Sequence, residues 1–562
     1  MSDENKKAPV SDANGQFKTL QDQYYQSWFR YHPEDAVDVG VYDYADKLRS
    51  YDHDDIGALI SLNKKMQSAM EEIHFSALSD DYQSDFLLIK GAIRIELHEF
   101  NSRDWRFRDP MVYVPVAAIY QLLIHPGDNF HQSVKHRLAL IPDYLRGARF
   151  MLLESPQTVV PGWLSTAVVM CESGADFIRG LCRNNLMVSQ FTHPDRLQPL
   201  LDDAASALLG FASFLRDEIE PLAQGDFAIG EADFNRLLKS HHALDVSAQE
   251  ILAVGESLYE TTEQELKQFT QAIRGNENVQ AWLDDIHSQH PDAVSLLDEY
   301  RQRMLQAQKC VLKQDIVTVP DKQSLRVQET PAFLRDVIPF AAYEPPMPQD
   351  EEQLGLYYVT TVDEEALLQE HNYFSIALTS AHEAFPGHHL QFVIANQNFG
   401  HNIPRLLNAS ATMYEGWALY CEDLCLEQGM LNKDEHRFIM LRDRLWRILR
   451  IIIDVKLQTG QLSLSEASDL MVEKLGFDKQ QADAEVSWYS SSPTIPLCYA
   501  IGRECILQLR KQCVSPDNKE ELKKFHDQLL SQGSIALPLV IKQVFGEQQW
   551  QSVYAAIFEK ND

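Results

Sequence analysis

Two histidines and a glutamate that could bind and use a metal ion lie close together between Ala381 and Gln391. His382 and Glu383 are adjacent, and His388 follows six positions after His382. A catalytic zinc ion takes imidazole and carboxylate ligands, usually three from the protein, and keeps one position open for water. A glutamate beside the ion can accept the proton of that water. These residues predict a hydrolytic metal centre with His382 and His388 as ligands and Glu383 as general base.

The spacing of the two histidines does not suit one regular helix. Residues four apart share a helix face, whereas six steps of roughly 100° carry His388 well off the face of His382. Pro386 removes a helix hydrogen bond and Gly387 tolerates unusual dihedral angles, so we expect them to bulge the helix and return His388 to His382. His389 is the alternative ligand. It shares the face of His382 in an undistorted helix but lies roughly 10 Å further along the axis, an awkward span for one ion.

A third ligand is expected downstream, in the segment from Tyr414 to Asp423. The segment is predicted to be helical, and Glu415 and Glu422, seven positions apart, share a face of such a helix. We assign the ligand role to Glu415, the nearer of the two, with Glu422 as the alternative. Glu422 or Asp423 is then expected to hold a histidine ring in orientation. The predicted cofactor is one Zn²⁺ per chain.

The two segments together resemble a bacterial family catalogued as domain of unknown function 885. Its motifs read HExxPGHxxQ and EGWALYxE, and both are present, at residues 382–391 and 415–422. The family motif has histidine at the position of His388, whereas the position of His389 varies, which favours His388 as the ligand. Weaker matches extend over nearly the whole chain. One departure is Gln458, which stands where the family usually shows a histidine after an arginine-rich helix.

The same motifs are similar to an expanded form of the site with two histidines and one glutamate that gluzincin metallopeptidases carry. The resemblance implies a mainly α, large, two-lobed helical fold with a deep cleft and a small β-sheet near the metal helix. It implies Tyr499 as a hydrogen-bond donor to the tetrahedral oxyanion, because gluzincins bring a tyrosine from the C-terminal part to that place. The implied reaction is zinc-dependent hydrolysis of peptide bonds in short peptides, as in a carboxypeptidase, dipeptidase or oligopeptidase.

Several further side chains are expected to meet the substrate. Residues 355–361 are rich in tyrosine, valine and threonine, which predicts a strand shortly before the metal helix. If it lies at a sheet edge, its unpaired backbone groups could hold an extended peptide, with Tyr357 and Tyr358 beside it. A plain strand inside a sheet explains the pattern equally well.

A substrate carboxylate would need a cation. An apolar segment that reaches Asp454 contains four arginines, Arg442, Arg444, Arg447 and Arg450. Most of them are expected to be solvated or paired with acidic side chains. Arg450 and Arg503 are the candidates for binding a substrate carboxylate. Which of them faces the site, and therefore which end of a peptide is trimmed, stays open at this point.

The elements that must position these residues are mostly helices. Apolar residues recur at three- and four-residue intervals through much of the chain before Asp315, the pattern of stacked amphipathic helices. From about Ile316 to Thr361 the pattern changes to short strands. We expect a disordered tail over residues 1–16, a helical lobe over 17–315 and a metal-site lobe over 316–562, together one structural unit. The helical lobe should exclude folded proteins from the site.

Composition limits the partners. A formal charge of −32 argues against nucleic acid and anionic membranes as partners, because both are polyanions. The most apolar run, residues 111–124, is too short to span a membrane. The eight cysteines are scattered and indicate buried thiols, among them Cys421 and Cys425, rather than a disulfide framework. Residues 1–16 show no apolar signal core, so we expect a cytoplasmic protein, or a periplasmic or lipid-anchored one if a leader precedes this sequence. The oligomeric state stays open.

Two alternatives to a zinc peptidase remain. The site could belong to a non-catalytic protein that binds peptides or metal, or to a hydrolase of a non-peptide amide. Glu383 favours catalysis, because a pure binding site would not need it.

Overall fold

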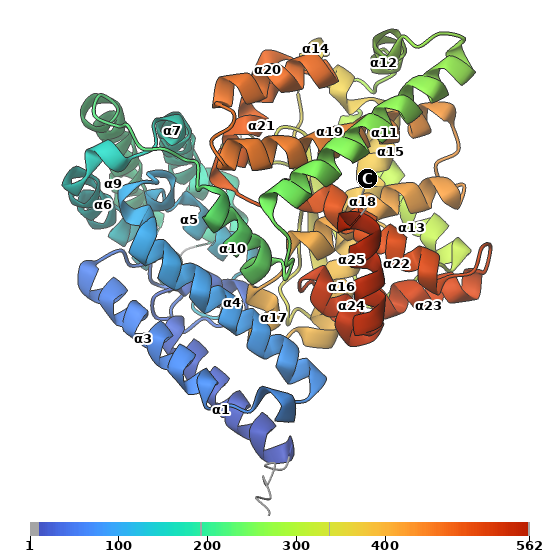
Figure 1. Cartoon of the computed structure of the whole chain (residues 1–562). Helices are drawn as coiled ribbons and strands as arrows, with labels where there is room; N and C mark the ends of the chain where they lie inside the picture. The colour runs from blue at the N-terminus through green and yellow to red at the C-terminus, as the bar shows by residue number, and fades with distance from the viewer. Residues whose placement is uncertain (1–9, 191–193, 336–337, 363, 560–562) are drawn as a thin grey trace, which may run out of the picture. The chain divides into compact units, whose positions relative to one another are not determined.

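The computed structural model describes residues 10–190, 194–335, 338–362 and 364–559. It divides into two compact units, Met1–Phe227 and Ala228–Asp562. The described elements are almost all helices (Figure 1). The second unit also contains one three-stranded sheet. The mainly α prediction is therefore confirmed, while the two-lobed arrangement around a deep cleft stays a prediction. No helix in the described ranges is long and apolar enough to cross a membrane.

The first unit is built from amphipathic helices that bury one face each. Along α6 the buried positions recur at alternating steps of four and three residues, at Val134, Leu138, Ile141, Leu145, Ala148 and Leu152. This face packs on α5 and α9, and α7 packs along α9. The bounds are α1 (Val10–Trp28), α2 (Pro33–Asp38), α3 (His53–Glu71), α4 (Asp80–Ser102), α5 (Val116–Ile124), α6 (Phe130–Glu154), α7 (Pro161–Asn184), α8 (Leu186–Ser189) and α9 (Pro194–Phe214).

The N-terminal tail expected over residues 1–16 is only partly covered by the described residues. Residues 1–9 lie outside them, and residues 10–16 form the first turns of α1 rather than a disordered segment. Phe17, which follows these turns on the same helix, is fully buried. The helix is therefore anchored in the core directly after them.

The second unit carries every candidate site residue. Its helices are α10 (Glu231–His241), α11 (Ala248–Arg274), α12 (Val279–His287), α13 (Leu296–Gln314), α14 (Glu365–Leu368), α15 (Tyr373–Glu383), α16 (His388–Phe399), α17 (Ile403–Leu407), α18 (Ala411–Glu427), α19 (Asp434–Gln458), α20 (Leu464–Leu475), α21 (Lys479–Ser491), α22 (Cys498–Cys513), α23 (Lys519–Leu530), α24 (Leu537–Val544) and α25 (Glu547–Phe558). The boundary between the compact units differs from the sequence-based one at residue 315, because α11 packs along α19 and α13 against α15.

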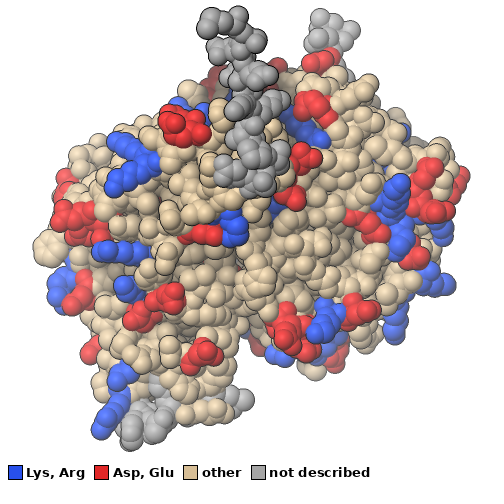
Figure 2. All heavy atoms as spheres, turned by 90° about the horizontal axis from the view of Figure 1, so that it is seen from below, with Lys and Arg blue, Asp and Glu red and all other residues tan. Residues whose placement is uncertain are grey.

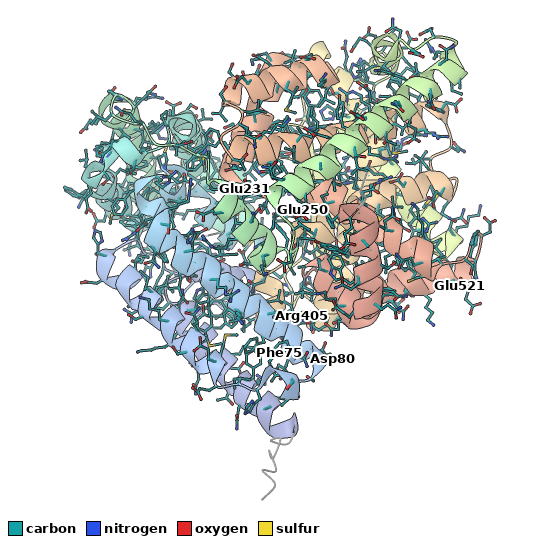
Figure 3. All side chains as sticks on the ribbon, in the orientation of Figure 1. Phe75, Asp80, Glu231, Glu250, Arg405 and Glu521 are labelled. Atoms are coloured by element: carbon teal, nitrogen blue, oxygen red, sulfur yellow. The ribbon has the colours of Figure 1, made fainter. Side chains whose placement is uncertain are left out.

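Local sequence signals fix several helix ends. Ser247 and Glu250 form a capping box at the start of α11, where Glu250 lies in the first turn (Figure 3). The same helix ends at Gly275, whose φ of +73° is the left-handed conformation that glycine adopts without strain. The thiols of Cys421 and Cys425 are free and buried on α18, as expected from the sequence.

The sheet decides between the two alternatives for the strand at residues 355–361. Its strands are β1 (Ser324–Glu329), β2 (Ala341–Glu344) and β3 (Leu354–Val359), in the order β1-β3-β2. β3 pairs in parallel with β1 and antiparallel with β2, so Tyr357 lies opposite both Val327 and Tyr343. Of the two alternatives left open for residues 355–361, the strand inside a sheet is the one present: β3 is central, and its backbone groups are used within the sheet. The edge strand β2 packs against α15.

Charged groups of both signs share the surface. Figure 2 shows one face of the molecule, on which Asp and Glu side chains are interspersed with Lys and Arg side chains. The chain as a whole has 82 Asp and Glu residues against 50 Lys and Arg residues.

Candidate metal centre

The helix that carries His382 ends before His388. α15 ends at Glu383 and α16 begins at His388, so the expected bulge in one continuous helix is wrong and a break takes its place. Pro386 has no backbone N–H to continue the helix. The N–H of Gly387 instead donates to the carbonyl oxygen of Ala381, at 3.0 Å. The chain therefore folds back on the last turn of α15.

Glycine is required at this fold-back. A Cβ atom at position 387 would lie 1.7 Å from the carbonyl oxygen of His382, which is backbone and cannot move aside. Trp417, fully buried on α18, donates its indole N–H to the carbonyl oxygen of Pro386 at 2.9 Å and holds the break against α18. As a result the first residue of α16, His388, lies beside His382. The ring centroids of the two histidines are 4.8 Å apart.

Three side chains converge at this point. One ligand atom each from His382, His388 and Glu415 can be chosen so that all lie within 4.8 Å of one another. Oε2 of Glu415 is 3.4 Å from Nε2 of His382 and 3.3 Å from Nε2 of His388. This oxygen is buried and makes no hydrogen bond of good geometry to any described residue. Two imidazole nitrogens and a carboxylate oxygen around one point fit the donor set of a catalytic zinc site.

Glu422 orients His382 within this group. The Nδ1–H of His382 donates to Oε1 of Glu422 at 2.9 Å, which leaves Nε2 directed at Glu415. A ligating histidine is commonly held by a carboxylate in this way. Asp423, the other candidate for this role, is bound by Arg444 and Arg503 instead. Of the two acidic residues, only Glu422 contacts the histidine.

The carboxylates of Glu415 and Glu422 favour a positive charge at the point where the side chains converge. Burial alone would lower the pKa of His382, but Glu415 and Glu422 raise it to about 10. Burial would raise the pKa of Glu415, but the charges of His388 and His382 hold it well below its usual range. Without an ion the carboxylates thus keep a proton on the histidine, and a divalent cation can take the place of that proton.

His389 points away from this group. Its Nε2–H donates to Oε1 of Gln323 at 2.9 Å, and its Nδ1 lies 3.1 Å from the hydroxyl of Tyr343 on β2. Burial lowers its pKa to about 3, so the ring stays neutral. Both nitrogens are engaged on the sheet side, and the alternative with His389 beside His382 is not what the structure shows.

Glu383 is the last residue of α15 and lies next to the three converging side chains. Burial raises the pKa of its carboxyl group, while the charges of His382 and His388 lower it in part. The side chain is partly buried rather than enclosed. Its position suits a base that must stay reachable for water.

Tyr499 reaches the site through a close helix crossing. A Cβ atom at Gly502 of α22 would lie 2.8 Å from Cα of Gly416 of α18, so the two helices touch through their backbones. Glu415 precedes one of these glycines and Tyr499 lies one turn before the other. The Tyr499 ring is parallel to the His382 ring, with centroids 6.5 Å apart. No described residue hydrogen-bonds its hydroxyl group.

The two tyrosines of β3 that were expected to meet the substrate are enclosed in the core. Tyr357 is fully buried, packs against Tyr300 with ring centroids 5.7 Å apart, and has its hydroxyl beside Ser380 of α15. Tyr358, also buried, follows it on β3, and successive side chains of a strand point to opposite faces.

Neither expected cation is free. Arg450 pairs with Glu485 at 3.0 Å and donates to the hydroxyl of Tyr489 at 2.9 Å. Arg503 pairs with Asp423 and Glu504. Both guanidinium groups are balanced by acidic groups of the chain itself.

Some residues around the site gave no sequence signal of their role. Tyr343 and Gln323 hold His389, and Trp417 holds the helix break. All three act through contacts between segments far apart in the sequence, so no local pattern could have identified them. Trp417 alone lies inside a recognisable motif.

Comparisons with known proteins agree with this fold. The profile of a family described as "Bacterial protein of unknown function (DUF885)" matches residues 33–544. A structure from Shewanella oneidensis, described as a candidate lipoprotein of unknown function, has a TM-score of 0.76 and 20% identity over 94% of this chain and 99% of that chain. A candidate lipoprotein from Colwellia psychrerythraea has a TM-score of 0.79 and 16% identity over 98% of this chain and 100% of that chain. These two likenesses show a shared fold.

A third structure is less similar. Metallocarboxypeptidase 1 from Trypanosoma cruzi has 12% identity over 98% of this chain and 99% of that chain, with a TM-score of 0.43, too low to establish a common fold. The curated proteins give no match.

Proposed function

The chain belongs to the DUF885 family of bacterial proteins of unknown function, and we propose that this member is a zinc-dependent hydrolase of peptide bonds in short peptides. The observation that carries the proposal is the convergence of two histidine Nε2 atoms on one buried oxygen of Glu415, with Glu422 holding one ring and Glu383 beside the group. This is a three-ligand set with a neighbouring carboxylate.

In this proposal His382, His388 and Glu415 hold one Zn²⁺. A zinc ion bound there would lower the pKa of a water molecule and polarise the substrate carbonyl. Glu383 accepts the proton of the attacking water and later donates it to the leaving amine. The hydroxyl of Tyr499, which has no partner among the described residues, donates to the oxyanion that forms on the substrate.

The burial of the ligands supports short or extended substrates. The side chains of His382 and His388 are 8% exposed and that of Glu415 is 13% exposed. A group this deep can meet an extended peptide, whose backbone is slim, more readily than the surface of a folded protein. We therefore propose that short peptides are cleaved and stably folded proteins are spared.

A random peptide mixture tests the activity. Zinc-loaded wild-type protein and the zinc-loaded Glu383→Gln variant are incubated with the mixture, and products are identified by mass spectrometry. Products from the wild type alone support the proposal. If neither protein cuts any peptide across neutral pH, a binding protein or a hydrolase of a non-peptide amide becomes the better account. Rapid cleavage of stably folded proteins would contradict the restriction to short peptides.

A location in the cell envelope is a further part of the proposal. The similar structures from Shewanella oneidensis and Colwellia psychrerythraea are described as candidate lipoproteins. We propose that this protein is likewise lipid-anchored or periplasmic, rather than cytoplasmic. Fractionation of the native host tests this: recovery with membranes in a detergent-releasable form, or release by osmotic shock, supports it, and recovery with the cytosol contradicts it.

A further inference from the structure

One arginine of α19 differs from its neighbours. The other three arginines of the helix core each pair with an acidic side chain, Arg442 with Asp443, Arg444 with Asp423 and Arg450 with Glu485. Arg447 makes no ion pair within the described ranges. Its Nε and Nη1 atoms are buried and hydrogen-bond to none of the described residues.

Arg447 lies beside the proposed catalytic residues. Its guanidinium carbon is 3.8 Å from the ring centroid of Trp446 and 5.9 Å from that of Tyr499. Tyr499 also neighbours His382, whose ring lies parallel to the tyrosine ring. The arginine and the metal ligands therefore share one neighbourhood around Tyr499.

Two buried donors of Arg447, Nε and Nη1, have no acceptor among the described residues, although the guanidinium stacks on Trp446, and unsatisfied donors are unfavourable for the fold. These donors lose water and gain no acceptor, and an apolar side chain of similar volume would be tolerated better. Asp443, one turn earlier on α19, is within electrostatic range, yet no ion pair joins the two among the described contacts. An acceptor from outside the chain would satisfy Arg447. The acceptor that matches a guanidinium best is a carboxylate, through two parallel hydrogen bonds.

We propose that Arg447 binds the C-terminal carboxylate of a peptide substrate, so that the protein removes residues from the C-terminal end. The inference rests on the proposed hydrolytic function and defines its substrate class. Arg447 takes the role expected of Arg450 and Arg503, because the charges of those two are balanced inside the chain. A carboxylate bound at Arg447 would bring the last peptide bonds of the substrate towards His382 and Glu383.

Two matched peptide pools test the proposal. Both contain N-acetylated random tetrapeptides, one pool with a free C-terminal carboxylate and the other with a C-terminal amide. Zinc-loaded wild-type protein should deplete the free-acid pool about tenfold faster or more. Arg447→Met should lose this preference by slowing only the free-acid pool, and Arg447→Lys, which keeps the charge without the planar fork, should show an intermediate preference.

A binding measurement separates this proposal from the hydrolytic one. In equilibrium dialysis, zinc-loaded Glu383→Gln protein should hold the free-acid pool more tightly than the amide pool, and the double variant with Arg447→Met should not. Equal cleavage and binding of the two pools by proteins with Arg447 would overturn the carboxylate site and leave hydrolysis standing. Preferential binding of free acids without any cleavage would overturn hydrolysis and leave the carboxylate site standing. Neither cleavage nor binding would overturn both.

Two controls exclude a purely structural role. Arg437, on the same helix, is exposed and pairs with Glu265 at 3.3 Å, so Arg437→Met should keep the preference for free acids. The thermal unfolding midpoint of Arg447→Met should stay close to that of the wild type, because the change removes two unsatisfied donors together with the stacking of the guanidinium on Trp446. A lower midpoint would show that Arg447 stabilises the fold and would count against a ligand-binding role.

Discussion

The Nδ1–H group of His382 donates a 2.9 Å hydrogen bond to Oε1 of Glu422, a residue 40 positions further along the chain. The bond fixes the ring so that Nε2 is the nitrogen available to an ion. It also joins α15 to α18, the helix that supplies Glu415. The proposed metal site thus depends on how these two helices pack, and His382 is oriented before an ion arrives.

Glu422→Gln is therefore expected to weaken zinc binding by about 10- to 100-fold, since the amide cannot stabilise the imidazole as a carboxylate does. Competition with a chelator of known affinity measures the change. Glu427→Gln, an exposed change on the same helix whose wild-type side chain pairs with Arg510, should leave zinc affinity unaltered. Equal affinities for Glu422→Gln and wild type would remove Glu422 from the site.

The choice between the neighbouring histidines can be measured directly. His388→Ala should lose bound zinc, because its Nε2 is one of the two nitrogens beside Glu415. His389→Ala should keep about one zinc per chain, because both of its nitrogens bond to Tyr343 and Gln323. Elemental analysis of the dialysed proteins gives the content. Loss of zinc in His389→Ala alone would reverse the assignment.

Glu383→Gln should keep zinc and fold while losing turnover, because the amide has the same size and cannot accept the proton of water. Metal content, circular dichroism and peptide cleavage are measured on one preparation. Unchanged cleavage would exclude Glu383 as the base, and loss of zinc would make it a ligand instead.

The sequence was enough to predict that His382, His388 and Glu415 come together, but less able to predict how. Glu415 and Glu422 follow from helix periodicity, because seven positions return to one face. The break before His388 does not follow, because it depends on the carbonyl of His382 and on the indole of Trp417, a helix away. Similarly, the composition of β3 predicts a strand, yet its central place is set by β1 and β2 pairing on both sides.

Charge pairing was the least predictable feature. The arginines of α19 look alike in sequence, and only tertiary contacts distinguish Arg447 from Arg450. Glu485, which neutralises Arg450, comes from α21, and no local pattern connects the two residues. Roles that depend on which side chain is left without a partner therefore require a structure.

Asp109, in the first unit, should make stability depend on pH. Burial raises its pKa from 3.8 to about 6, although the backbone N–H of Met111 donates to its Oδ1 at 2.8 Å. The folded state thus holds this proton more tightly than the unfolded state does. Its contribution to stability is complete below about pH 4 and is lost as the pH rises through about 6, by at most about 3 kcal/mol.

Asp109→Asn removes that titration. Between about pH 4 and 6 the variant should gain stability relative to the wild type as the pH rises, measured by denaturant unfolding of both proteins at each pH. Asp143→Asn, a change on the same unit at a side chain that is 76% exposed, should track the wild type. A difference between Asp109→Asn and wild type that does not vary with pH would refute the buried-carboxyl interpretation.

The last prediction concerns the fold-back that brings the two histidines together. In Gly387→Ala the new methyl group would lie 1.7 Å from the carbonyl oxygen of His382 and 2.6 Å from that of Ala381. Both atoms are backbone, so the loop between α15 and α16 must open, at a loss of about 3 kcal/mol, the upper end for an overpacked site. Opening moves His388 away from Glu415, and the variant should lose zinc as well as thermal stability.

Gly57→Ala is the matched control, because Gly57 lies inside α3 with no atom within 4 Å of the added methyl group. Alanine is favoured over glycine there by about 1 kcal/mol, so this variant should be slightly more stable and bind zinc normally. Calorimetry and metal analysis of the two variants compare a methyl group added at the fold-back with one added on an open helix surface. Normal zinc binding by Gly387→Ala would mean that His388 can reach His382 without the close approach of Gly387, and the site would then depend on the anchoring of Pro386 by Trp417 alone.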